Sequence, residues 1–341
     1  MSLPIGIGII GTGSIVNNYV KCISELEEAN LVALYTKSSD RVKSAEKQFG
    51  VPVFSNIDEF LAQNNLDLVC ICNESGRHGE AIKAAAQAGK HILSEKPLEV
   101  TADKVDEVIK VCNENGVKLG CVLQNRCSAD YVLLETAVKD GKLGKLLMGN
   151  AHINWYRSEE YYSGSDWRGT LQYDGGAALM NQGIHTIDLL INLMGEVSSV
   201  FGKVHTSVHK IEGEDVGSAI LNFNGGAIGN ITAGTALYPG YPERLEIYGE
   251  KGSVLMEAGK IVEWNVPDTT APNTASKDGD GSGAADPTAI GHQNHKTVLA
   301  DMLMAIQEGR SPMVGGDEAR KAVAVINAIY NSSKSEKLVQ L

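Results

Sequence analysis

Long apolar runs are missing from this chain of 341 residues. No stretch approaches the roughly 20 apolar residues that a membrane-spanning helix needs. The apolar run at residues 5–10 contains glycines and has neither a basic leader nor a cleavage site, so it is not interpreted as a signal peptide. Positive charge is scarce too, since 30 Lys and Arg stand against 42 Asp and Glu and the net charge is −12. This balance argues against nucleic acid or an anionic membrane surface as the main partner.

Cysteine is also sparse and lacks metal-ligand spacing. The six cysteines form no C-x-x-C motif, and no ligand pattern joins them to the histidines, so no metal site is predicted. Scattered thiols are typical of small buried side chains in a reducing compartment, which favours a cytoplasmic protein. The hydrophobic fraction of 43% is ordinary for a globular protein. The chain is long enough for two domains with sizeable cores.

The first third of the chain alternates between strand and helix patterns. Aliphatic runs separated by amphipathic segments of about a dozen residues are typical of a parallel, doubly wound α/β sheet. We therefore expect a dinucleotide-binding Rossmann domain over residues 1–124. Strands are predicted over 5–10, 30–36, 66–72, 90–95 and 117–124, and helices over 14–26, 40–49, 77–89 and 101–114.

The first strand-to-helix turn reads GTGSIV (11–16). Gly11 permits a tight turn, and Gly13 lets the backbone approach a pyrophosphate. Ser14 and Ile15 then open a helix whose free N–H groups stabilise the phosphates. Val16 replaces the third glycine of the fingerprint, but the strand-turn-helix context is the one that the motif requires.

The end of the second strand indicates which cofactor is preferred. An NAD-preferring site has an Asp or Glu there for the ribose hydroxyls. This chain has Thr36, followed by Lys37, Ser38 and Arg41, which would accept a 2′-phosphate. The cofactor is therefore predicted to be NAD(P), with NADP favoured. The alternative is that Lys37 and Arg41 are only solvated surface charges.

The strict alternation stops after Gln124, and residues 125–341 are expected to form an α+β domain with a large, mostly antiparallel sheet. Hairpin signals at 224–226 and 250–252 support this sheet. Residues 267–291, rich in Gly, Pro, Ser, Thr and Asp, are predicted to be an exposed loop. Strands are predicted over 146–156, 198–208, 216–223, 227–236, 244–250 and 252–258, and helices over 129–140, 294–308 and 317–334.

His185 opens an apolar helix in the stretch GGAALMNQGIHTIDLL. A histidine at this place is either a satisfied core residue or the proton carrier of an active site. Gly175 and Gly176 would let the backbone approach a ligand. Asp188, one helical turn after the histidine, is a candidate to orient the imidazole.

Three motifs in order, GIIGTGSI, SEKPL (94–98) and GGAALMNQGIHTIDLL, resemble those of the Gfo/Idh/MocA oxidoreductases. The resemblance covers nearly the whole chain. The segment WYRSEEYYSGSDWRGT (155–170) is similar to the branch that oxidises C3 of UDP-N-acetyl-2-amino-2-deoxyglucuronate. The family's fold is a Rossmann domain followed by an α+β domain whose free sheet face commonly builds a dimer, so a homo-dimer or homo-tetramer is expected.

The resemblance also implies catalytic roles. The family's matching lysine contacts the reacting hydroxyl, which assigns Lys96. The family commonly has an acidic residue four positions before the histidine, where this chain has Asn181. Asn can orient a hydroxyl but cannot accept a proton, so the role of general base shifts to His185, alone or shared with Lys96. Four further residues are expected to line the cofactor pocket beside Lys96: Asn73, His78, Glu95 and Gln124.

An aromatic and basic cluster is the candidate site for the substrate. Arg binds carboxylate or phosphate in a bidentate manner, and aromatic rings stack on sugar faces. An anionic sugar would need such a local site on an acidic protein. The alternative is a subunit-contact loop. The candidate residues, besides Lys96, Asn181 and His185, are Arg126, Tyr156, Arg157, Tyr162, Trp167 and Arg168.

These expectations combine into an NAD(P)-dependent oxidoreductase that acts on a hydroxyl or keto carbon of a sugar or nucleotide-sugar derivative. One alternative is a glycosidase that retains NAD(P) and uses it for redox-assisted elimination. Another is a non-catalytic NADP(H) sensor. Net reduction of the cofactor by substrate separates the dehydrogenase from the glycosidase.

Overall fold

A computed structural model describes residues 4–270 and 291–341. Its contacts divide the chain into two units, Met1–Gln124 with His292–Arg320, and Asn125–Gly291 with Lys321–Leu341. The division after Gln124 coincides with the expected boundary. Residues 292–320, expected in the second domain, instead belong to the first unit, because α9 (Gln293–Glu308) packs on α1 (Val16–Ser24) there. Most of the loop expected over 267–291 lies outside the described residues.

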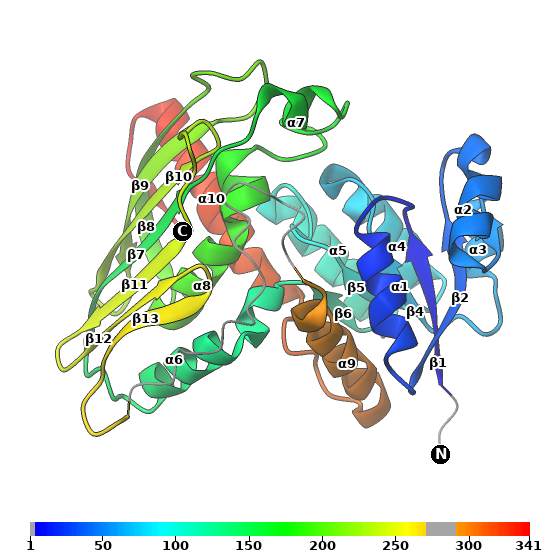
Figure 1. The fold of residues 1–341 in the computed structure, drawn as a ribbon, viewed down its shortest axis with the longest axis horizontal. Coiled ribbons are helices and arrows are strands. Elements are labelled where there is room, and N and C mark those ends of the chain that lie inside the picture. The colour runs from blue at the N-terminus through cyan, green and yellow to red at the C-terminus, as the bar shows by residue number, and fades with distance from the viewer. Residues whose placement is uncertain (1–3, 271–290) are drawn as a thin grey trace. The chain divides into compact units, whose positions relative to one another are not determined.

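The first unit is built on a six-stranded parallel sheet of order β3-β2-β1-β4-β5-β6 (Figure 1). This confirms the doubly wound α/β fold class. All six residues of β1 and all four of β4 are buried, as expected for strands that helices cover on both faces. The strands are β1 (Ile5–Ile10), β2 (Ala29–Tyr35), β3 (Val53–Phe54), β4 (Leu68–Ile71), β5 (His91–Ser94) and β6 (Leu119–Cys121).

The helices of this unit follow the predicted spans closely. α4 packs on α5, and α1 packs on α9. The sequence did not predict β3 or α3, because each is too short to show a period. The last strand ends at Cys121, and Gln124 opens the turn η3 (Gln124–Cys127). The remaining elements are η1 (Ser39–Arg41), α2 (Val42–Phe49), α3 (Ile57–Leu61), η2 (Ser75–Arg77), α4 (His78–Gln87), α5 (Ala102–Glu114) and the start of α10 (Gly316–Ser335).

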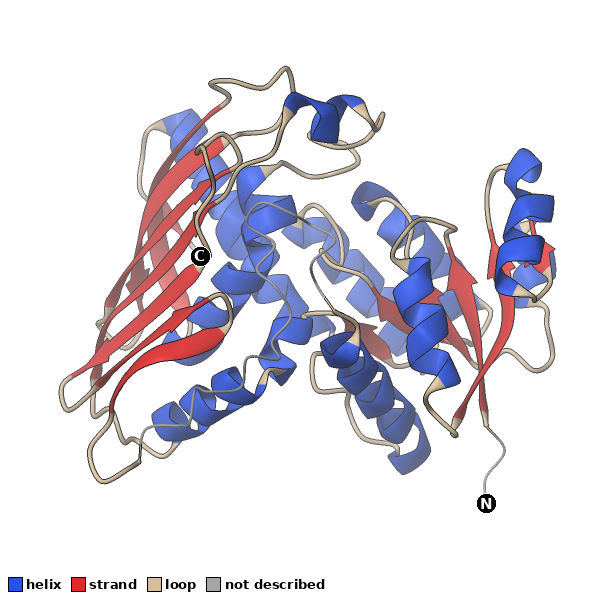
Figure 2. Ribbon diagram, viewed as in Figure 1, coloured by secondary structure: helices blue, strands red, loops and turns tan. Residues whose placement is uncertain are grey.

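The second unit contains an eight-stranded sheet of order β13-β12-β11-β7-β10-β9-β8-β14 (Figure 2). Its pairs are antiparallel except for the parallel pair β7 and β10, which confirms the mostly antiparallel sheet. Both predicted hairpins are present, β9–β10 and β11–β12. The strands are β7 (Leu146–Asn154), β8 (Val197–His205), β9 (Val216–Phe223), β10 (Ile228–Gly234), β11 (Arg244–Gly249), β12 (Ser253–Glu257), β13 (Lys260–Asn265) and β14 (Val339–Gln340).

One face of this sheet is covered by helices. A Cβ on Gly149 of β7 would lie 2.7 Å from Leu190 of α8 (Ile184–Met194), and one on Gly202 of β8 would lie 2.9 Å from Ile329 of α10. The other helices of the unit are α6 (Ala129–Lys139), α7 (Glu159–Ser163) and the π-helix η4 (Ala178–Gly183). The sequence did not predict α7, η4, β13 or β14.

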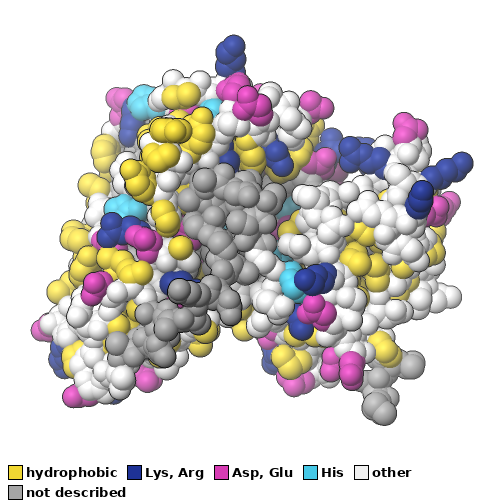
Figure 3. All heavy atoms as spheres, in the orientation of Figure 1, with side chains coloured by type: hydrophobic (Ala, Val, Ile, Leu, Met, Phe, Trp, Pro, Cys, Tyr) yellow, Lys and Arg dark blue, Asp and Glu magenta, His cyan; other side chains and the backbone are white. Residues whose placement is uncertain are grey.

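The opposite face of the sheet is open and partly apolar. Phe201, Ile220 and Ile228 are 44–52% exposed and lie on the same face as Tyr248, as their pairing registers require. Figure 3 shows hydrophobic side chains interspersed with charged ones over the strands of this unit. Across residues 4–270 and 291–341, no helix is long and apolar enough to cross a membrane.

Candidate functional site

The turn between β1 and α1 has the geometry of a phosphate-binding loop. Gly11 has φ +118°, and a Cβ there would lie 2.6 Å from the Cys72 carbonyl oxygen, so only glycine fits. A Cβ on Gly13 would meet no atom within 4 Å. The exposed Gly13 and Ser14 therefore leave open space before the N–H groups of α1, where a pyrophosphate binds in such turns.

Three neighbouring strands of the first unit end with polar side chains at one edge of the sheet. Asn73 follows β4, Glu95 and Lys96 follow β5, and Gln124 follows β6. Asn73 Oδ1 and Gln124 Oε1 are buried, and neither has a hydrogen-bond partner among the described atoms. Buried polar atoms are normally paired. Each of these two oxygens can therefore accept a hydrogen bond from an N–H or O–H donor of a ligand.

Glu95 is held from two sides beside the half-buried Lys96. Tyr19 of α1 donates its hydroxyl hydrogen to Glu95 Oε1 at 2.9 Å, and His295 Nε2 of α9 lies 3.5 Å from the same oxygen. Burial alone would raise the pKa of the Glu95 carboxyl, but His295, Lys96 and the Tyr19 hydroxyl outweigh it and lower that pKa to about 2. A negative charge therefore stands next to Lys96.

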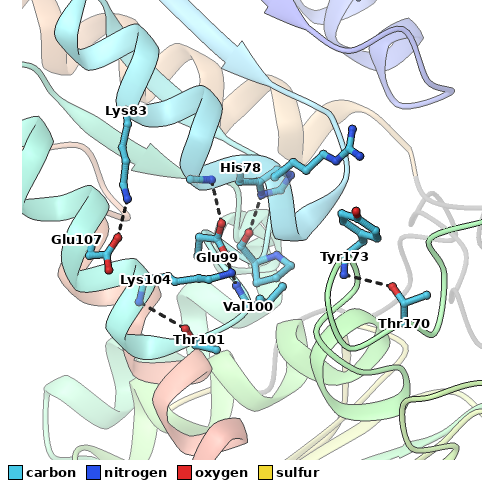
Figure 4. Close-up of polar contacts among 12 residues, drawn as sticks. His78, Lys83, Glu99, Val100, Thr101, Lys104, Glu107, Thr170 and Tyr173 are labelled. Atoms are coloured by element: carbon cyan, nitrogen blue, oxygen red, sulfur yellow. Dashed lines mark hydrogen bonds and ion pairs between the residues drawn. The ribbon is translucent and has the colours of Figure 1, made fainter. Parts of the chain in front are cut away.

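His78 is buried among the segments that follow the strands of the first unit. Its ring is 1% exposed, with Nδ1 2.7 Å from the Pro97 carbonyl oxygen and Nε2 3.1 Å from that of Asn73. Burial lowers its pKa. Figure 4 shows the bond to Pro97 and the neighbouring Glu99, which accepts the Gly79 N–H at the start of α4 at 3.1 Å. His78 thus lies between the segments after β4 and β5, and its ring can donate to a carbonyl oxygen of either one.

The end of β2 presents the expected polar group. Thr36 is buried, and its Oγ1 accepts the Ser38 N–H at 3.4 Å. Lys37 and Arg41 are exposed, and neither forms an ion pair with a residue that the structure describes. No carboxylate occupies the place of Thr36.

In the second unit, the π-helix η4 leads directly into α8. Asn181 lies in η4, and half-buried His185 lies in the first turn of α8. The Asn181 side-chain amide donates to Asp174 Oδ1, and Asp174 Oδ2 accepts the Gly169 N–H at 2.8 Å. Asp174 is 1% exposed. The segment therefore does contain a carboxylate, but the sequence places it seven residues before Asn181.

Two side chains expected at the ligand are instead paired with each other. Arg126 donates from Nε to Asp188 Oδ2 at 2.7 Å and from Nη2 to Oδ1 at 2.6 Å. Both side chains are at least nine-tenths buried. Arg126 and Asp188 thus form a bidentate ion pair between η3 and α8. The predicted roles of Arg126 at the substrate and of Asp188 beside His185 stay predictions.

The aromatic and basic cluster divides into buried and open members. Arg157 is 3% exposed and donates to Gln182 Oε1 at 2.7 Å, and buried Tyr162 donates to Thr235 Oγ1 at 2.8 Å. Burial removes the Arg157 guanidinium from a binding surface, whereas Tyr162 still lines the pocket described below. Tyr156, Trp167 and Arg168 are partly exposed.

Arg168 belongs to a pocket of about 390 Å³ formed within the second unit. Its guanidinium lies 4.3 Å from the Tyr161 ring centroid. Lys210 also lines the pocket, and neither cation forms an ion pair with any side chain in the described ranges. The other lining residues are Glu159, Tyr162, Ser163, Ser165, Gly169, Thr170, Ile211 and Glu212.

Sequence reasoning missed the polar residues that organise the segment around Asn181. Asp174, Gln182 and Glu214 are buried and bonded to the segment that carries Asn181. Only the Asp-Gly-Gly run at 174–176 hinted at a special turn. Lys96 lies in the first unit, whereas Asn181 and His185 lie in the second. No three His, Cys, Asp or Glu side chains in residues 4–270 and 291–341 gather as a metal site would require.

Comparison with known proteins places this geometry in context. Residues 5–122 match the model of an oxidoreductase family with an NAD-binding Rossmann fold, and residues 131–255 match the GFO/IDH/MocA C-terminal domain. The chain is 31% identical to the WlbA dehydrogenase of Bordetella pertussis in complex with NADH and UDP-GlcNAcA, with 99% of both chains covered and a TM-score of 0.89. The Chromobacterium violaceum WlbA, in complex with the same two compounds, is 28% identical, with 100% of this chain and 96% of that one covered and a TM-score of 0.90. Myo-inositol 2-dehydrogenase of Thermotoga maritima is 26% identical over 98% of both chains.

Proposed function

Because this chain belongs to the Gfo/Idh/MocA family of NAD-binding oxidoreductases, we infer that it transfers a hydride between a nicotinamide and a hydroxyl-bearing carbon of a nucleotide-linked sugar acid. It is an enzyme that acts on a sugar CH–OH group. The observation that carries the finer proposal is the second-unit pocket, which two cations, Arg168 and Lys210, line together with the carboxylates of Glu159 and Glu212; neither cation forms an ion pair with a described side chain. A diphosphate or carboxylate fits such a pair. The two WlbA complexes with UDP-GlcNAcA support the same substrate class.

The proposed chemistry divides among three side chains. Lys96, at the carboxyl end of β5, stabilises the substrate oxygen as negative charge develops on it. His185 accepts the hydroxyl proton, and Asn181 orients a sugar hydroxyl. The bound nicotinamide supplies the hydride acceptor. Ionised Glu95 beside Lys96 favours the ammonium form of that lysine.

The first unit fits the cofactor. The open turn at Gly13 receives the pyrophosphate, and Asn73 and Gln124, each with a buried acceptor, line the cofactor pocket at the carboxyl ends of their strands. NADP is proposed as the preferred form, because Thr36, Lys37 and Arg41 present no negative charge to a 2′-phosphate.

A homo-oligomer is proposed through the open face of the second-unit sheet. Phe201, Ile220 and Ile228 are exposed apolar side chains on three adjacent strands. Monomers rarely leave such a patch open on a sheet. Light scattering of the wild type and of Ile220→Glu would show a lower mass for the variant.

The test measures the near-ultraviolet absorbance of reduced nicotinamide when the purified protein is mixed with NAD⁺ or NADP⁺ and each of a panel of substrates. The panel contains UDP-linked amino-sugar uronic acids, the same sugars without the nucleotide, and inositols. Cofactor reduction with the UDP-linked acids alone is the expected result. Reduction by inositol alone would contradict the substrate class.

Lys96→Met is the variant that tests the role proposed for Lys96. It should lower kcat by about 10²–10³-fold, the usual loss when a group that stabilises a developing oxyanion is removed, while the cofactor Kd stays within threefold. Turnover of a glycoside without net cofactor reduction would favour a retained-cofactor glycosidase. Unchanged turnover in Lys96→Met would reject the proposed chemistry.

A further inference from the structure

The segment that carries Asn181 and leads into His185 is a π-helix rather than an α-helix. In η4 the Gln182 N–H donates to the Ala177 carbonyl, five residues earlier, at 3.2 Å. Such wide turns are rare and occur frequently at functional sites. Like any helix, η4 begins with N–H groups that have no partner within the helix itself. Groups outside η4 must therefore satisfy them.

Glu214 accepts hydrogen bonds from three consecutive backbone N–H groups, those of residues 177–179 at the start of η4. Its Oε1 accepts the Leu179 N–H at 2.7 Å, and its Oε2 accepts the Ala177 N–H at 3.3 Å. The Glu214 backbone carbonyl accepts the Ala178 N–H at 3.0 Å. Glu214 is 4% exposed and comes from the segment before β9. A distant residue thus supplies the cap that the segment before η4 does not provide.

Tyr330 of α10 completes the arrangement. Its hydroxyl donates to Glu214 Oε1 at 3.0 Å. Gly176 has φ +139°, and a Cβ there would lie 2.1 Å from the Tyr330 hydroxyl oxygen and 2.9 Å from Glu214 Oε2. The expectation that Gly176 makes room for a ligand is therefore corrected, because this glycine makes room for Tyr330 and Glu214.

The ionisation of the Glu214 carboxyl and its hydrogen bonds to the backbone N–H groups are coupled. Burial raises the pKa of the Glu214 carboxyl, while the N–H donors and Tyr330 oppose that rise. A carboxylate accepts stronger hydrogen bonds than a neutral group of the same shape. The backbone N–H groups of residues 177–179 are thereby all hydrogen-bonded to Glu214.

We propose that Glu214 and Tyr330 are positioning residues, which hold the first turn of η4 and so set where Asn181 and His185 point. The roles of Asn181 and His185 in this inference rest on the proposed function. Glu214 and Tyr330 act through the backbone, not on the substrate.

The test uses Glu214→Gln and Tyr330→Phe in the full chain. Gln keeps one acceptor but turns an NH₂ group toward a backbone N–H, and Phe removes only the hydroxyl. Tyr131→Phe is the matched control, because this buried tyrosine accepts a 2.6 Å hydrogen bond from Asn192, near the other end of α8. Amide hydrogen exchange over residues 176–186 is measured together with kcat and KM.

Both variants should raise amide exchange in residues 177–183 at least tenfold and lower kcat at least tenfold, with the KM for cofactor within twofold. Tyr131→Phe should change neither by more than twofold. Unchanged exchange in both variants would overturn the inference, and so would raised exchange with wild-type kcat.

The proposed function and the positioning inference can be rejected independently of each other. If the positioning inference is wrong, the wild type still turns over its substrate and Lys96→Met still loses activity. If the wild type reduces no cofactor with any sugar, the proposed function fails, and the exchange measurement alone decides whether Glu214 and Tyr330 hold η4. Should Glu214→Gln fail to fold, Tyr330→Phe, which keeps the ring, gives the answer.

Discussion

The side-chain amide of Asn181 donates a hydrogen bond to the buried carboxylate of Asp174. The Asn181 Oδ1 in turn accepts from Gln182 Nε2 at 3.2 Å. This relationship fixes which way the amide points, since only its NH₂ group can face a carboxylate. It also explains why an acidic residue at position 181 would be unfavourable in this chain.

Asn181→Asp should destabilise the protein more than Asn181→Ala does. Two carboxylates within hydrogen-bond reach cannot both ionise easily, so the pKa of one of them rises in the folded state. The folded variant then binds more protons than the unfolded one, and its stability increases as the pH falls. We expect a loss of about 2–3 kcal/mol at pH 8, the scale of a hydrogen bond to a charged group. Urea unfolding from pH 8 to pH 5 measures the recovery, and a pH-independent loss would contradict this account.

The ion pair between Arg126 and Asp188 should behave as a structural unit. Removing one partner of a buried pair costs about 3–5 kcal/mol, because the other charge stays buried and unpaired. Arg126→Met and Asp188→Leu should each show this loss in urea unfolding, while the double variant loses less than either single one. If Arg126 bound substrate instead, Arg126→Met would raise KM and leave the stability unchanged.

The cofactor preference should depend on the residues after β2. Thr36→Asp should shift the ratio of the NADP and NAD dissociation constants toward NAD by at least about tenfold, equivalent to 1.4 kcal/mol, because its carboxylate repels a 2′-phosphate. Lys37→Ala should weaken NADP alone. Fluorescence titration with NADPH and NADH measures both. Lys47→Ala, on exposed α2, is the control and should change neither constant. Equal weakening of both cofactors by Lys37→Ala would reject a role in phosphate recognition.

Ionised Glu95 should stabilise the first unit in a pH-dependent way. Its pKa is lowered from 4.5 to about 2, so its contribution is complete above about pH 4.5 and is lost as the pH falls toward 2. A shift of this size corresponds to about 3 kcal/mol. Glu95→Gln should therefore lose about 3 kcal/mol at pH 7, and the difference from the wild type should shrink between pH 4.5 and pH 3. Glu107→Gln, at an exposed ion pair, is the control. A constant difference across this range would contradict the prediction.

Local sequence signals determined most of the parallel sheet of the first unit and the residues that follow its strands. Continuous aliphatic runs give buried parallel strands, and residues just after such strands come together at one edge of the sheet. For this reason the sequence pattern alone places Asn73, Lys96 and Gln124 at the ends of neighbouring strands. Gly11 and Gly13 were also predictable, because the strand-turn-helix motif has glycines at these positions; in the structure a Cβ on Gly11 would meet the Cys72 carbonyl oxygen, whereas one on Gly13 would meet no atom within 4 Å.

Only the tertiary structure decided how the buried polar side chains are paired. Asp188 lies 62 positions from Arg126, and Tyr330 lies 116 positions from Glu214, so no periodicity links them. A hydrophobic pattern states which face of an element is buried, but it does not say which charged group the fold brings to it. A buried charge must find its partner or lose its ionised form. The chain therefore encodes its strands and its cofactor turn locally, whereas the support of Asn181 and His185 arises from contacts that exist only after folding.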